Sequence, residues 1–150
     1  MSTIKIEDVA HVRFRAPDLA QMQAFLEDFG LAVVEAGEER LVTRGAGPSP
    51  IAHVTERGEP GFAGVAFRAA SLADLERLAE AEGVQVVDCD LPGGGRMITL
   101  RDPDGHRVDV VAGQTPAPPL ALDARQPWNR AEARDRLRAV KRIAPGAASV

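Results

Sequence analysis

Hydrophobic and polar positions repeat along the chain at an offset of 53 residues. At this offset residues 9–35 fall on residues 62–88 without a gap, and 11 of the 27 pairs are identical. The shared pattern is Phe-Arg-Ala, then Leu-Ala, then Gly-x-x-Val-Val, all in one register. Self-similarity at a fixed offset is the signature of a repeated structural unit. The sequence therefore predicts two modules of the same topology.

Each unit is predicted to open with a strand and a helix. His11–Arg15 and Gly64–Arg68 alternate in the way of half-buried strands. The segments that follow carry apolar residues at helical spacing. Each helix starts after an N-cap side chain and ends at a glycine, from Asp18 to Gly30 and from Ser71 to Gly83.

Three short strands are predicted to follow in each unit, and the last two of them repeat at an offset of 56 residues. Ala32–Glu35 and Val84–Asp88 come first; Arg40–Thr43 then falls on Arg96–Thr99, and Ile51–Thr55 falls on Arg107–Val111. The expected fold is α+β, with two tandem βαβββ modules (8–57 and 62–113) in one domain, 1–113. We expect the helix–sheet cores to contain Phe14, Phe25, Phe67, Leu75 and Leu78.

One segment carries a specific resemblance. Asp102-Pro-Asp-Gly-His-Arg-Val-Asp-Val110 is similar to the D-P-D-G-x-x-[ILV]-[ED] motif of the vicinal oxygen chelate superfamily, which includes glyoxalases, bleomycin-resistance proteins and extradiol dioxygenases. Pro92–Gly95 and Gly58–Phe67 resemble the family too, and the likeness covers residues 8–113. It implies a cup-shaped mixed sheet that holds a divalent metal, with ligands from the first and last strands of the modules.

The repeat places four residues at the positions where the family has ligands. They are His11 and Gly64 on the first strands and His53 and Asp109 on the last. Two imidazoles and one carboxylate form a facial triad suited to Fe(II) and other first-row metals. The candidate metal ligands are therefore His11, His53 and Asp109. The family more often has His or Gln at the position of Gly64 and Glu at that of Asp109.

The same residues have simpler interpretations. His11 can hydrogen-bond at the mouth of the cup, His53 can face solvent, and Asp109 can pair with Arg107 or Arg13. The chain has only three histidines and no tyrosine, so the sequence identifies no catalytic acid–base residue. We expect this domain alone to hold no metal, with Fe(II) or another divalent metal as the alternative.

Other reactive residues add little chemistry. His106 lies in the Asp-Gly turn and is expected to be solvated, and Cys89 has no obvious activating base. Gly93–Gly95 is not a phosphate loop, because neither Lys-Ser/Thr nor a helix follows it. A single cysteine, no signal-peptide pattern and no apolar run of membrane-spanning length favour a soluble, cytoplasmic protein.

Charge separates the chain into two parts. The net charge is −4, made of −8 over residues 1–113 and +4 over residues 114–150. No basic patch with interleaved aromatics is present, which excludes nucleic acid as an expected partner. Residues 114–129 are predicted to form a Pro-rich linker, and Arg130–Ile143 a basic helical arm capped by Asn129. We expect 114–150 to mediate a homodimer or docking to a second domain.

This tail extends the resemblance. In two-domain proteins of the extradiol-dioxygenase type, a first, often metal-free module pair is followed by a Pro-rich linker with Pro-x-Asn and a basic stretch, which Gln126–Asn129 and Lys141–Val150 resemble. The resemblance implies the non-catalytic N-terminal part of an extradiol, catechol-type ring-cleavage dioxygenase, an oxidoreductase of aromatic catabolism. The alternatives are an autonomous divalent-metal enzyme of the glyoxalase/dioxygenase type and a drug-binding resistance protein. A small aromatic or dicarbonyl-type molecule is the expected ligand, and whether the chain is an enzyme stays open.

Overall fold

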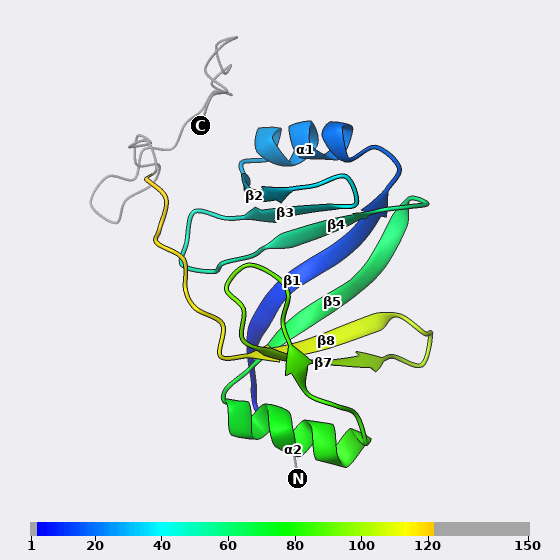
Figure 1. Ribbon diagram of the computed structural model, residues 1–150, viewed down its shortest axis with the longest axis vertical. Helices are drawn as coiled ribbons and strands as arrows, with labels where there is room; N and C mark the ends of the chain where they lie inside the picture. The colour runs from blue at the N-terminus through cyan, green and yellow to red at the C-terminus, as the bar shows by residue number, and fades with distance from the viewer. Residues whose placement is uncertain (1–2, 122–150) are drawn as a thin grey trace, which may run out of the picture.

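The computed structural model describes residues 3–121 and shows the predicted β-α-β-β-β order twice (Figure 1). The first module consists of β1 (Ile6–Ala16), α1 (Leu19–Asp28), β2 (Ala32–Ala36), β3 (Arg40–Arg44) and β4 (His53–Arg57). The second consists of β5 (Gly61–Ala69), α2 (Leu72–Glu82), β6 (Val87–Asp88), β7 (Arg96–Arg101) and β8 (Arg107–Ala112). Within residues 3–121, neither helix is long and apolar enough to cross a membrane. The predicted helical arm lies outside the described residues.

All strands belong to one mixed sheet with the order β2-β3-β4-β1-β5-β8-β7-β6. The central strands β1 and β5 are antiparallel, and each pairs on its other side with the parallel last strand of its own module. Val12 pairs with Val65, and these two positions are related by the 53-residue repeat. A pseudo-twofold axis therefore passes between β1 and β5, which places α1 and α2 at opposite ends of the molecule (Figure 1).

The predicted caps define where both helices begin. The Asp18 side chain accepts hydrogen bonds from the backbone N–H groups of Ala20 and Gln21, at 2.9 and 3.0 Å. The Ser71 hydroxyl accepts one from Asp74 at 3.0 Å. These oxygens satisfy backbone donors that have no partner inside the first helical turn. Gly83 ends α2 in the left-handed conformation, φ +66°, which a residue without Cβ adopts at no steric cost.

The two helices cover what we call the outer face of the sheet, and they pack on it differently. Beneath α2, a buried cluster joins helix and sheet and includes Leu75, Ala79, Ile98 and Val110; Leu78 is partly buried against it. The core prediction for Leu75 is confirmed, and Phe14 and Phe67 are half-buried. The prediction for Phe25 on α1 is wrong, because its side chain is 60% exposed.

The opposite, inner face of the sheet carries a second core. Its apolar members come from both modules and from the segment between β6 and β7: Ala10, Val42, Ile51, Val54, Ala66, Cys89, Leu91, Met97 and Val111. Cys89 is a buried free thiol, in agreement with the inert thiol expected from the sequence. This packing fills part of the cup that the family resemblance implied, and it ties the two modules together.

Residues 114–121, which we call the strap, leave β8 and run back along the first module. Backbone hydrogen bonds join Thr115 to Gly93, Ala117 to Pro48 and Leu120 to Ala46, at 2.8 to 2.9 Å. The expected linker therefore begins as an extended segment held against the body of the domain. In Figure 1 it runs upward along the left side of the sheet, in yellow to orange.

Candidate site on the inner face of the sheet

Strand register decides which candidate ligands lie on one face. In the first module β1 pairs with β4 so that Val12 lies opposite His53. In the second, β5 pairs with β8 so that Val65 lies opposite Val108. Because Val12 and Val65 are equivalent, the counterpart of His53 is Val108, and the offset between the last strands is 55 residues. The expected superposition of His53 on Asp109 is therefore wrong by one residue.

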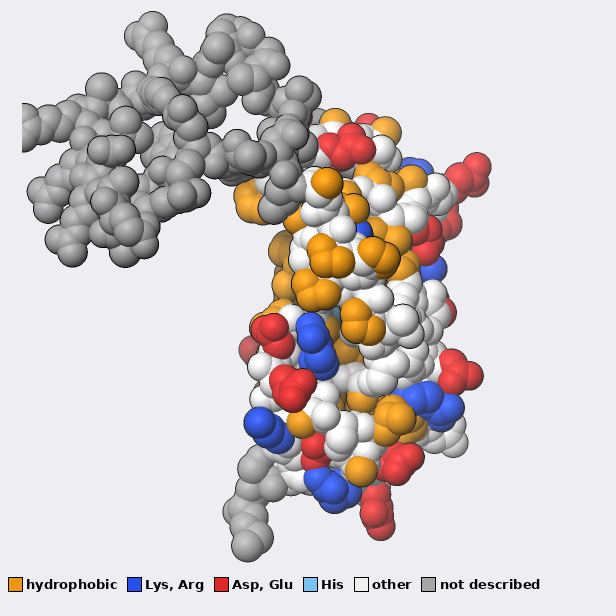
Figure 2. Space-filling model, turned by 90° about the vertical axis from the view of Figure 1, so that its left-hand side faces the viewer, with side chains coloured by type: hydrophobic (Ala, Val, Ile, Leu, Met, Phe, Trp, Pro, Cys, Tyr) orange, Lys and Arg blue, Asp and Glu red, His pale blue; other side chains and the backbone are white. Residues whose placement is uncertain are grey.

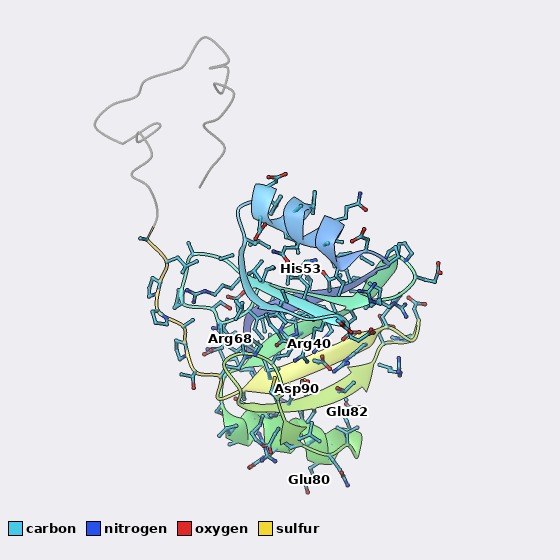
Figure 3. All side chains as sticks on the ribbon, turned by 45° about the horizontal axis from the view of Figure 1, so that its top comes forward. Arg40, His53, Arg68, Glu80, Glu82 and Asp90 are labelled. Atoms are coloured by element: carbon cyan, nitrogen blue, oxygen red, sulfur yellow. The ribbon has the colours of Figure 1, made fainter. Side chains whose placement is uncertain are left out.

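A shift of one residue moves a side chain to the other face of a sheet. The counterpart of Asp109 is Val54, whose side chain belongs to the inner-face core. His53 instead lies on the outer face beneath α1, as Figure 3 also shows. The structure thus brings His11 and Asp109 to the inner face and does not bring His53 to them.

His53 lines an apolar cavity of about 510 Å³ between α1 and the sheet. Its ring stacks on that of Phe14, with centroids 5.3 Å apart and planes 2° from parallel. Its Nδ1 lies 3.3 Å from the Thr55 hydroxyl. Burial lowers the pKa of His53 below its ordinary value of 6.5, so the imidazole is neutral at pH 7.

Asp109 is fully buried, and both of its oxygens accept hydrogen bonds. Oδ2 accepts from Arg13 Nε at 3.0 Å, and Oδ1 accepts from Arg107 Nε at 2.8 Å and from the Thr99 hydroxyl at 2.7 Å. Arg13 also donates from Nη1 to Glu56 at 3.0 Å. The carboxylate is therefore neutralised by two guanidinium groups, as a buried charge requires.

His11 lies beside this network with a side chain that is 2% exposed. Among the described residues, neither of its ring nitrogens has a hydrogen-bond partner. Burial, followed by the positive charge of Arg13, lowers the pKa of His11 from 6.5 to about 4. The imidazole is therefore neutral at pH 7, and two of its buried polar atoms are unsatisfied.

The donor set on the inner face does not fit a divalent metal. Asp109 is engaged by two cations, Val54 offers no donor, and Gly64 has no side chain. Gly64 could not gain one without strain, because a Cβ there would lie 2.4 Å from the carbonyl oxygen of Arg107 and its φ is +150°. Of the four described positions His11, Val54, Gly64 and Asp109, only His11 retains free ligand atoms, and a tight site needs three or four converging ligands.

The Asp-Pro-Asp-Gly-His turn between β7 and β8 also gathers Asp102, Asp104 and His106. Asp102 Oδ1 accepts from the backbone N–H groups of both other residues, at 3.0 and 2.8 Å, and its Oδ2 lies 3.2 Å from His106 Nδ1. These hydrogen bonds, first the backbone one from His106, lower the pKa of Asp102. The motif thus shapes the exposed turn, as expected for His106.

A second ion network links the two modules at the edge of the inner face. Arg40 donates from Nε to Glu35 at 2.9 Å and from Nη1 to Asp90 at 2.6 Å. Figure 3 places Arg40 and Asp90 close together, between the first module and the segment that precedes β7. Arg40 lowers the pKa of Asp90 chiefly through its hydrogen bond, and Glu35 raises that of Arg40.

Sequence reasoning weighed Arg13 only as an optional partner of Asp109 and did not consider Thr99. The signal for Arg13 was present, because it stands two residues after His11 in an alternating strand and so shares its face. A charged side chain at such a position needs a buried counter-ion. Thr99 gave no signal, because it pairs with Asp109 only through the register of β7 and β8.

Comparison with known structures agrees with the fold. The Mn(II)-bound glyoxalase from Novosphingobium aromaticivorans superposes with a TM-score of 0.71 and 21% identity, covering 81% of this chain and 44% of that chain. An anaerobic substrate complex of homoprotocatechuate 2,3-dioxygenase from Brevibacterium fuscum, with 3,4-dihydroxyphenylacetate, gives a TM-score of 0.64 and 22% identity, covering 76% and 39%. The chain therefore spans less than half the length of either protein.

Sequence comparison establishes the family. A comparison with curated proteins gives no match. The sequence profile of one family matches residues 8–110, which is more than two thirds of the chain and covers most of both modules. The chain belongs to the Glyoxalase/Bleomycin resistance protein/Dioxygenase superfamily.

Proposed function

We propose that this domain is a non-catalytic member of the superfamily that supports a separate catalytic domain of the extradiol ring-cleavage type. The observation that carries the proposal is the state of Asp109. Its carboxylate is bound by Arg13, Arg107 and Thr99 on the face where relatives of this fold would place a metal ligand. A guanidinium at this place compensates the negative charge of the buried carboxylate, as a bound metal cation would.

The packing of the inner face supports the same role. A cup that turns over substrate needs an open volume beside its reacting groups. Here Cys89 and Leu91 pack with residues of both modules in a buried apolar cluster. Such packing suits a domain that contributes rigidity and a surface, and that leaves ring cleavage to another part of the protein.

The test is iron loading of the full chain under anaerobic conditions, followed by elemental analysis and an assay of catechol cleavage. We expect no ring cleavage. We also expect less than about 0.1 iron per chain after desalting, because a site with a Kd on the order of micromolar or weaker loses its iron in that step. The His11→Ala/Asp109→Ala double variant is the control for specific binding. One iron per native chain that is absent from the double variant would refute the proposal. The result on the native chain is sufficient if the variant does not fold.

The second candidate is an autonomous metal enzyme, and one observation favours it. Both nitrogens of His11 are buried and unsatisfied, which a bound ion or water would relieve. This function requires Arg13 to leave Asp109 so that the carboxylate becomes free. The same iron-loading experiment distinguishes the two candidates, because only the second predicts one metal per chain.

A further inference from the structure

Arg44, the last residue of β3, is a buried cation that has no counter-ion within residues 3–121. Its side chain is 8% exposed, and its Nη2 donates to the carbonyl oxygen of Pro118 in the strap at 2.7 Å. Its Nη1 is buried and has no hydrogen-bond partner among the described residues. None of the ion pairs formed within residues 3–121 includes Arg44.

Arg13 shows what a buried guanidinium in this protein otherwise requires. It is 3% exposed and contacts two carboxylates, Asp109 and Glu56. Burial of a charge is costly unless an opposite charge and hydrogen bonds compensate it. Arg44 has one carbonyl acceptor in place of two carboxylates, so its surroundings favour the arrival of an anion.

Arg44 lines a cavity of about 550 Å³, a size typical of sites for small molecules. The rest of the wall is mainly apolar and comes from β2, two loop segments and the strap, with Val34, Pro50, Pro92 and Leu120 among its residues. Figure 2 shows hydrophobic side chains gathered over the upper part of this face of the molecule. The cavity thus combines one cation with an apolar surface.

Much of this wall is rigid. Proline fixes its own backbone angle, and five of the lining residues are prolines. Gly93 approaches Pro50 so closely that a Cβ at residue 93 would lie 2.6 Å from the proline ring. The strap is fixed across the cavity by backbone hydrogen bonds from Thr115 and Leu120. A rigid wall lowers the entropic cost of binding.

We propose that this cavity binds a small organic anion in which a carboxylate is attached to an apolar, single-ring body. The carboxylate accepts a charge-assisted hydrogen bond from Nη1 of Arg44, while Nη2 keeps its hydrogen bond to the Pro118 carbonyl. The ring packs on Val34, Leu120 and the prolines. The site lies at the end of β3, on residues separate from the His11, Arg13 and Asp109 cluster on β1 and β8.

The test uses the native full chain and three probes: benzoate, its neutral counterpart benzamide, and acetate, which lacks the ring. Binding is followed by amide chemical shifts in NMR titrations. Benzoate should bind at least tenfold more tightly than either other probe and should shift the amides of Thr115, Ala117 and Leu120, because these residues line the cavity. Absence of benzoate binding, or equal affinity for benzamide, would overturn the proposal.

Substitutions of residues that line the cavity test whether benzoate binds there. Arg44→Met keeps the apolar stem and should weaken benzoate binding at least tenfold, whereas Arg44→Lys should retain part of it. Val34→Trp, at a position that is 42% exposed, should block the cavity. Arg101→Met removes an exposed arginine at the end of β7 and should leave affinity unchanged. Unchanged affinity in Arg44→Met would overturn the assignment, and the probe series on the native chain decides the matter if that variant does not fold.

Discussion

The two modules share one topology but differ in how their helices meet the sheet. Beneath α2, fully buried Leu75 and Ile98 close the gap between helix and strands. Beneath α1 a cavity of about 510 Å³ remains, and Phe25 and Phe29 at its rim are 60% and 75% exposed. The comparison shows that a duplicated backbone does not fix the packing of each copy, because core filling depends on individual side chains.

The two modules also contribute different residues to the inner face. The second module supplies Asp109 and its partners Thr99 and Arg107, while the first supplies Arg13 and the unsatisfied His11. Arg13 of the first module and Asp109 of the second thus form an ion pair across the pseudo-twofold axis. A network that spans both modules should affect the stability of the whole domain.

The largest effect is expected from breaking this network. Asp109→Asn leaves Arg13 buried without its principal counter-charge and should lower the free energy of unfolding by about 3–5 kcal/mol. Glu56→Gln removes the other, half-exposed partner of Arg13 and should cost about 1 kcal/mol or less. Urea denaturation of both variants measures the difference. Equal losses in the free energy of unfolding would show that the buried Asp109–Arg13 pair stabilises the domain no more than the half-exposed Glu56–Arg13 pair does.

The next effect follows from the lowered pKa of His11. Its value of about 4 in the folded state lies below about 6.5 in the unfolded state. As pH falls from 6.5 to 4, the unfolded chain takes up a proton that folded His11 resists, so up to about 3 kcal/mol of stability is lost. His11→Leu should remove this part of the pH dependence. Parallel pH profiles for the native and variant chains would contradict the lowered pKa.

The third prediction compares the packing of the two helices. Met22 and Leu75 occupy equivalent positions of the 53-residue repeat. Leu75→Ala should cost about 2–5 kcal/mol because it opens a cavity in a filled core. Met22→Ala enlarges a cavity that already exists and should cost only about 1 kcal/mol. Thermal unfolding of the pair gives the difference, and similar costs would show that α1 is as tightly packed as α2.

The sequence predicted the topology well because topology follows from periodicity. The strand and helix patterns, the caps Asp18 and Ser71, and the 53-residue repeat that relates Val12 to Val65 agree with the structure. These features depend on local spacing, which the 53-residue repeat preserves. They needed no knowledge of side-chain packing.

The candidate site was less predictable, because it depends on register. The loops before β4 and β8 differ in length, and an offset of 56 in place of 55 put His53 in line with Asp109. The sequences of β4 and β8 can be aligned at either offset. A difference of one residue nevertheless moves each side chain to the opposite face of the sheet. Phe25 was misplaced for a related reason, since helical spacing indicates a face but not whether the sheet fills the space beneath it.

The proposed function depends on Arg13 and Arg107 taking the place of a metal at Asp109. Titration of the native chain with Mn(II), followed by paramagnetic broadening of amide signals, tests it most directly. We predict at most weak broadening at the exposed Asp102–His106 turn, with the amides of His11 and Asp109 unaffected at equimolar Mn(II). Selective loss of the His11 and Asp109 signals at one equivalent, abolished in His11→Ala, would contradict the account.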